Sequence, residues 1–197
     1  MIDVELDHAP LREWLRSKTQ KAHDRADVAF GALLQEGLQG LQKLLTAHAL
    51  AAPALCLRIR MQPSLPFGND FDPAQVTSLL ACDLERLGAT PPAPVLTEGF
   101  TTAAECAGAA YTLAGSRLGS KMIARQWRAR FPDSGFSSAY LDHENLFGDW
   151  RTFCSCLNGL EEISLNRNLI LNGALAAFAL FEAACDTAVA AQLKRHV

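Results

Sequence analysis

Apolar residues recur every three or four positions along most of the chain, which is the spacing of one face of an α-helix. The first such face covers 11–30, and Pro10 directly before it suits the first turn of a helix. The spacing continues over 33–60, where Pro53 is expected to kink or divide the helix. No segment alternates convincingly like a strand, and the helical pattern is weakest at 55–61.

Capping residues mark further helix ends. Asp72 before Pro73 predicts a helix start, and Gly88 predicts the end of the same helix. Thr102 and Glu105 have the spacing of a capping box. Segments rich in proline or glycine at 63–72, 89–98 and 132–135 predict loops, and further helices are expected at 103–130, 137–141, 144–160 and 164–194. The sequence therefore predicts an all-α, single-domain helical bundle over 1–197, with its core at about 11–194.

Composition and charge narrow the function. The chain has 197 residues, 49% hydrophobic and 20% charged, as expected of one soluble globular domain. Its net charge of −3 and scattered basic residues argue against a general nucleic-acid binder. The acidic N-terminus does not match a secretion signal, and no apolar run reaches the roughly 18 residues that span a bilayer. A cytoplasmic location without membrane contact is expected.

The six cysteines show neither a CxxC pair nor a zinc-ligand spacing. Cys154 and Cys156 are the only close pair, and residues two apart on a helix point in different directions. We therefore expect ordinary buried or half-buried thiols.

A glycine-bearing stretch, Gly115 to Ser120, interrupts a segment that otherwise favours a helix. A glycine inside a helix costs about 1 kcal/mol relative to alanine. Gly115 and Gly119 are four residues apart and share one helix face, which therefore has almost no side chain. This bare face either lets two helices pack closely or admits a large, flat ligand.

Among the five histidines, His23 has the most suggestive neighbour. Asp27, four residues later on the same helix face, could accept a hydrogen bond from Nδ1 and leave Nε2 for a metal. The alternative is an ordinary surface ion pair between the two side chains. His48 lies on a mostly apolar face and is more typical of a packed core histidine. His143 lies in a loop-like segment, and His8 and His196 lie near the termini.

Two segments together resemble the heme oxygenase family, in particular its bacterial, phytochrome-associated type. Residues 15–27 (LRSKTQKAHDRAD) are similar to the proximal helix of that family, and residues 111–125 (YTLAGSRLGSKMIAR) resemble its distal helix. The segments 150–153 and 177–181 also fit its C-terminal helices. The order and spacing agree from about 11 to about 184.

The resemblance implies heme sandwiched between a proximal N-terminal helix and a glycine-kinked distal helix. His23 then matches the ligand of the heme iron, Asp27 the carboxylate behind it, and Arg16 a basic residue near a propionate. The matching catalytic positions on the distal helix are Gly115, Ser116 and Gly119. Further heme contacts are expected from Tyr111, Arg117, Ser120, Arg151 and Arg167, of which Arg151 and Arg167 could equally face solvent.

The resemblance also implies an activity. Heme, as substrate and cofactor, would be cleaved with O2 to biliverdin, Fe2+ and CO. The chain has no flavin, nucleotide or iron–sulfur motif, so electrons must come from a ferredoxin or a reductase, and the biliverdin could supply a bacteriophytochrome. Ala114 and Ser120 depart from the family pattern and leave open a non-catalytic heme- or bilin-binding protein on the same fold. A third alternative is a helical protein without heme, whose glycines only pack helices.

Overall fold

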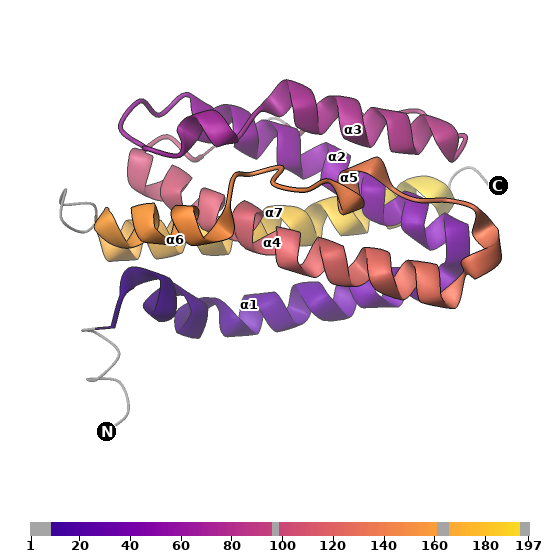
Figure 1. The fold of residues 1–197 in the computed structure, drawn as a ribbon, viewed down its shortest axis with the longest axis horizontal. Coiled ribbons are helices and arrows are strands. Elements are labelled where there is room, and N and C mark those ends of the chain that lie inside the picture. Colours follow the sequence, from indigo (N-terminus) through magenta and orange to yellow (C-terminus); the bar gives the residue numbers. More distant parts are fainter. Residues whose placement is uncertain (1–8, 96–98, 161–165, 194–197) are drawn as a thin grey trace.

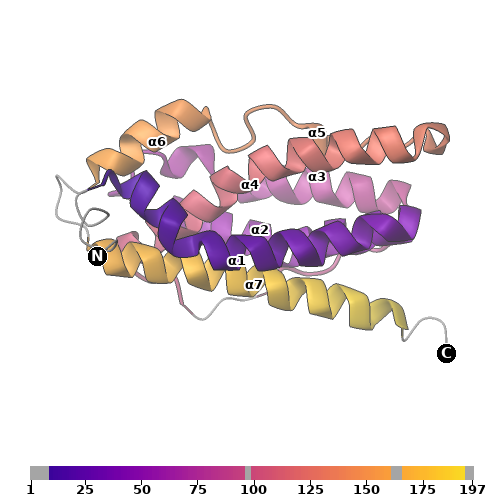
Figure 2. The same ribbon diagram turned by 90° about the horizontal axis from the view of Figure 1, so that it is seen from below.

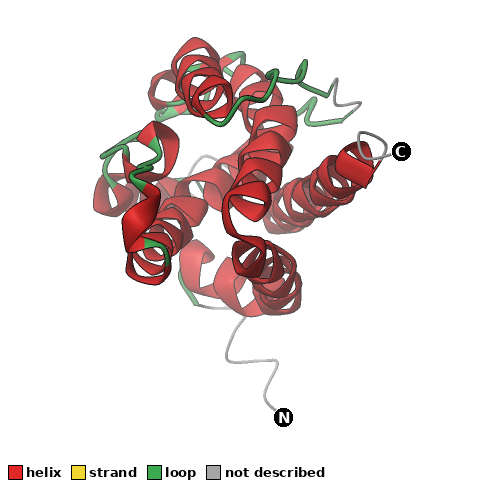
Figure 3. Cartoon of the chain, turned by 90° about the vertical axis from the view of Figure 1, so that its right-hand side faces the viewer, coloured by secondary structure: helices red, strands yellow, loops and turns green. Residues whose placement is uncertain are grey.

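The computed structural model of the chain describes residues 9–95, 99–160 and 166–193. Its α-helices are α1 (Leu11–Leu33), α2 (Gly37–Arg60), α3 (Pro73–Arg86), α4 (Ala103–Arg130), α5 (Ala139–Asp142), α6 (Trp150–Gly159) and α7 (Arg167–Leu193). Short 3-10 turns lie at Leu34–Glu36, Gly68–Asp70 and Pro132–Ser134. These three ranges contain no β-strand, so the all-α prediction is confirmed (Figure 3).

Four long helices, α1, α2, α4 and α7, run along the long axis of the bundle (Figure 1). The α4 helix packs most extensively against α7, and α2 contacts α3, α4 and α7. Helix α1 packs against α7 on one side of the bundle, whereas α3 covers the opposite side of α2 (Figure 2). The short α6 contacts both α1 and α4 near one end.

The predicted helix starts are largely those of the structure. The Asp72 carboxylate accepts a hydrogen bond from the Ala74 amide at 3.1 Å, and α3 begins at Pro73. Thr102 and Glu105 form the expected reciprocal capping box at the start of α4. Each cap satisfies backbone amides that have no partner within the helix.

Several boundaries differ from the prediction. Pro53 does not divide α2, which continues to Arg60 and includes most of the segment with the weakest helical pattern. The predicted helix over 144–160 begins only at Trp150, because Asn145 and Gly148 have positive φ angles and Asp149 caps the helix. The predicted ends of the last helix, Ser164 and Lys194, and the end of the connector at 96–98 lie outside the described residues.

Two glycines that did not stand out in the sequence bring α4 and α7 together. A Cβ atom at Gly108 would lie 1.9 Å from the carbonyl oxygen of Ile170, and one at Gly173 would lie 2.0 Å from that of Glu105. Neither distance is possible without moving a helix backbone. The closest part of the α4–α7 contact therefore depends on the absence of side chains at these two positions.

Helix α7 is long and apolar enough to cross a membrane by length and composition, contrary to the prediction that no segment would be. A third of that window is buried, against α4, α2 and α1. The mean hydropathy of this helix is high enough for a membrane span because its alanines and leucines outweigh Asn172 and Gly173. One such helix is weak evidence for a membrane span, since core helices of bundles meet the same criterion.

Candidate functional site

A cavity of about 470 Å³ lies between α1 and α4 and extends to residues of α2, α6 and α7. This volume is within the range of small-molecule and cofactor sites, roughly 300–1,000 Å³. His23 borders it from α1, and Gly115, Ser116 and Gly119 border it from α4. The structure thus brings the two sequence motifs, 84 or more residues apart along the chain, to opposite walls of one cavity.

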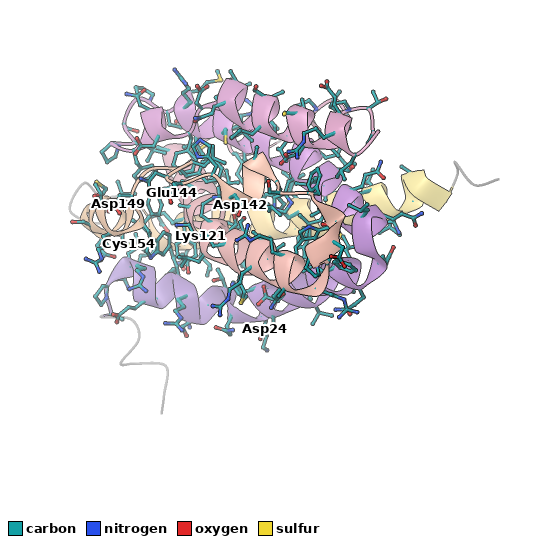
Figure 4. The ribbon with its side chains drawn as sticks, turned by 45° about the vertical axis from the view of Figure 1, so that its right-hand side comes forward. Asp24, Lys121, Asp142, Glu144, Asp149 and Cys154 are labelled. Carbon is teal, nitrogen blue, oxygen red and sulfur yellow. The ribbon has the colours of Figure 1, made fainter. Side chains whose placement is uncertain are left out.

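His23 lies on the flank of α1, next to the buried Thr19 and Ala22. Its Nδ1 lies 3.1 Å from Asp27 Oδ2, one turn later, and its side chain is 58% exposed. The neighbouring Asp24 projects outward from α1 in Figure 4 and binds Gln20 at 2.7 Å, so Asp27 is the carboxylate that orients the imidazole. With Nδ1 engaged as a donor, Nε2 is the nitrogen left for another ligand.

The ring of His23 also touches α7. Its centroid lies 6.2 Å from that of Phe178 in an edge-on arrangement. This contact and the bond to Asp27 restrain the imidazole from two sides, although more than half of the side chain is open to solvent or to the cavity. An imidazole held in one tautomer with one free nitrogen can serve as a metal ligand.

Two glycines of α4, Gly115 and Gly119, are not needed for helix packing. A Cβ at Gly119 would meet nothing within 4 Å, and one at Gly115 would meet only the Trp150 ring, at an ordinary 3.8 Å. The alternative in which these two glycines merely pack helices is therefore wrong; Gly108 and Gly173 do that. Helix α4 is continuous through both positions. Their bare backbone faces the cavity instead.

Two serines on the same face bind their own helix. The Ser116 hydroxyl donates to the Leu113 carbonyl at 2.7 Å, and the Ser120 hydroxyl donates to the Ser116 carbonyl at 3.1 Å. Because a hydroxyl has one donor and two acceptor sites, both oxygens can still accept a hydrogen bond. Both residues border the cavity.

One end of the cavity is basic. Arg12 and Arg16 border it from one face of α1, and the described residues place no ion-pair partner beside either guanidinium. Tyr111 lies nearby on α4; burial raises the pKa of its hydroxyl, while Thr19 and the two arginines act in the opposite direction. Arg16 was predicted. Arg12 was missed, although its spacing of four from Arg16 places it on the same face.

The opposite end is apolar and contains His48. Its Nδ1 donates to the Leu44 carbonyl at 2.9 Å, and the rings of Phe30, Tyr140 and Phe181 surround it at 5.3–5.4 Å between centroids. Burial lowers the pKa of His48 to about 4, so the imidazole is neutral. The predicted core histidine is confirmed. That it also borders the cavity could not be inferred from its apolar helix face.

Three arginines expected at the site do not border this cavity. Arg117 is buried and donates to backbone carbonyls that follow α5 or belong to it. Arg151 is exposed on α6, outside the cavity. Arg167 lies over the Trp14 ring, 5.4 Å from its centroid, and donates to the Ala9 carbonyl. Trp150, which the sequence analysis placed only in a segment that fits a C-terminal helix of the family, does border the cavity.

The donor set at this site is small. Among the described residues, no three His, Cys, Asp or Glu side chains converge as metal ligands. All six cysteines are free thiols, and Cys82 is exposed rather than buried as expected. A site with one orientable imidazole suits a metal whose other ligands belong to a macrocycle.

Comparisons with known proteins bear on the fold. No protein-family model matches the chain, and no curated protein matches it either. Its fold is similar to that of the heme oxygenase from Neisseria meningitidis, a structure determined with NO and CO bound. The TM-score is 0.70 at 15% sequence identity, over 91% of this chain and 92% of that protein. The chain therefore has the heme oxygenase fold.

Proposed function

We propose that this chain is a heme oxygenase, which binds heme between α1 and α4 and cleaves it with O2 and external electrons to biliverdin, Fe2+ and CO. The observation that supports this most strongly is the pairing of His23 with the bare face at Gly115 and Gly119 across one cavity. Neither glycine is required by the packing of the protein itself, so a ligand is the better explanation for the missing side chains.

The residues present fit heme. A porphyrin is flat and mostly apolar, and it has two carboxylates on one edge and an iron that accepts imidazole nitrogen. The cavity offers a bare helix face, the ring nitrogen of His23, and Arg12 and Arg16 at one end. Phe30 and Phe181 give the other end an apolar wall. Bound heme would supply the iron chemistry that activates O2.

The roles of the protein groups follow from their positions. Asp27 holds the His23 ring and makes Nε2 the better donor to iron. The bare backbone at Gly115 and Gly119 would form the cavity wall opposite His23 and would leave room there for only a small ligand beside bound heme. The Ser116 and Ser120 oxygens accept hydrogen bonds and can hold water beside that ligand. The aromatic rings at the far end exclude bulk water.

The partners remain part of this proposal. A ferredoxin or a reductase would donate the electrons, and a bacteriophytochrome would accept the biliverdin. The alternative is a non-catalytic heme or bilin carrier with the same fold. It predicts that the complex with heme persists under reducing conditions. Turnover therefore separates the two functions.

A hemin titration followed by absorption spectroscopy tests the proposal. Wild-type protein should give a one-to-one complex with a Soret band, and His23→Ala should not form it unless imidazole is added. Ascorbate, or ferredoxin with its reductase, should then convert the wild-type complex in air to a product with the red absorption of biliverdin. A persistent Soret complex would favour the carrier, and no complex at all would exclude a heme function.

A further inference from the structure

Arg117 of α4 binds the short helix α5 and so holds the two helices together. The residue is 9% exposed, and its Nη2 donates to the carbonyl oxygens of Tyr140 at 2.9 Å, Leu141 at 3.1 Å and His143 at 3.2 Å. Nη1 donates to the Ser120 hydroxyl at 3.2 Å. Burying a guanidinium is costly unless acceptors satisfy it, and here Nη1 and Nη2 have acceptors whereas Nε has none among the described residues. The bonds of Nη2 therefore need α4 and α5 in one relative position.

The other end of α5 is held by Asp83 of α3. This carboxylate is fully buried and accepts hydrogen bonds from the amides of Ala139 and Tyr140, both at 2.9 Å, and from the Ser138 hydroxyl. A carboxylate at the amide end and a guanidinium at the carbonyl end match the direction of the peptide dipoles. Helix α5 is therefore held in place by α3, and α4 is attached to it through Arg117.

The cavity side of α4 gives no such support. A Cβ at Gly119 would have no neighbour there and one at Gly115 would touch only the Trp150 ring, at 3.8 Å, while the tight contact with α7 is at Gly108, about two turns earlier. The position of the backbone at 115–120 is thus set from the outer side, by Arg117. Its bond to Ser120, whose hydroxyl binds the Ser116 carbonyl, extends this anchor to the cavity face.

We propose that Arg117 is a positioning residue, which anchors the Gly115–Ser120 backbone to α5 and thereby sets the height of the bare face above bound heme. This inference rests on the proposed function for its ligand. The position of that face would limit the space between the helix and bound heme, so Arg117 should affect which porphyrin edge is attacked without touching heme.

The first test needs no heme. Hydrogen–deuterium exchange should show amides in 115–122 exchanging about tenfold faster or more in Arg117→Met than in wild type, because the anchoring bonds are lost. Arg117→Lys keeps the charge but not the forked geometry and should be intermediate. The control is Arg128→Gln, which removes an exposed α4–α5 ion pair with Asp142 and should leave this segment unchanged.

The second test uses hemin-loaded protein. Arg117→Met should shift the Soret band and change the ratio of biliverdin isomers, with a hemin affinity within about threefold of wild type; Asp83→Asn should act in the same direction from the other end of α5. If Arg117→Met does not fold, Arg117→Lys and Asp83→Asn give the same comparison. Equal exchange at 115–122 in the Arg117 and Arg128 variants would overturn the anchor, whether or not wild type degrades heme. Changed exchange with an unchanged Soret band and isomer ratio would reduce Arg117 to a structural role.

Discussion

Gly108 of α4 and Gly173 of α7 lie so close that a Cβ at Gly108 would be 2.9 Å from the carbonyl carbon of Gly173. Gly119, three turns further along α4, has free space at the same position. One helix thus has glycines for two different reasons, close packing at one end and access to a cavity in the middle.

This contrast gives a matched pair of variants. Gly108→Ala should lower the free energy of unfolding by about 1–3 kcal/mol, because the methyl group forces α4 and α7 apart. Gly119→Ala should leave the stability unchanged or raise it by up to about 1 kcal/mol, since alanine favours the helix, yet it should weaken hemin binding. Urea unfolding and hemin titration measure the two effects. Equal losses of stability in both variants would contradict the assignment.

The sequence predicted the helices, because helix periodicity and caps are local signals. The pairing of His23 with the glycine face was implied by the resemblance to heme oxygenases and not by periodicity or spacing. The sequence did not predict Gly108 and Gly173, whose role depends on a neighbouring helix that no local pattern specifies. Arg117 was expected at heme because it lies inside the motif. Its side chain leaves the helix on the other side and binds α5, a direction that only the packed structure determines.

Asp27 should matter for heme binding and its neighbour Asp24 should not. Asp27→Asn weakens the acceptor for His23 Nδ1, and such outer-shell changes typically cost about 10- to 100-fold in metal affinity or activity. Asp24→Asn makes the same change of charge on a side chain that binds Gln20 instead. Hemin titration and single-turnover rates compare the two, and a similar loss in both would show that only net charge matters.

Arg12 and Arg16 should recognise the heme carboxylates. Replacing both by Gln should weaken hemin binding by roughly tenfold at low salt, with less effect at high salt, because exposed charges are screened. Heme dimethyl ester, which lacks the carboxylates, should bind wild type and the variant alike. Lys21→Gln, a charge change on the same helix outside the cavity, is the control. A hemin affinity that stays the same in the double variant would place the carboxylates elsewhere.

His48 should make the protein sensitive to mild acid. Its pKa is about 4 in the folded protein against 6.5 normally, chiefly because it is buried, with the Arg117 charge acting in the same direction. The unfolded chain therefore binds a proton at His48 before the folded chain does, and stability falls as the pH drops from about 6.5 toward 4. Between pH 7 and pH 5 this one group should cost about 2 kcal/mol of unfolding free energy.

The variant that isolates this effect is His48→Phe. A phenyl ring suits the surrounding Phe30, Tyr140 and Phe181, and the Leu44 carbonyl keeps its bond within α2. Urea unfolding at pH 7 and pH 5 should show the wild type losing about 2 kcal/mol more than the variant, because few carboxylates titrate in that interval. If both proteins lose the same amount, His48 takes up its proton in the folded protein over the same pH range as in the unfolded chain. Its surroundings would then have to hold a buried charge with the Leu44 carbonyl as its one hydrogen-bond acceptor among the described residues.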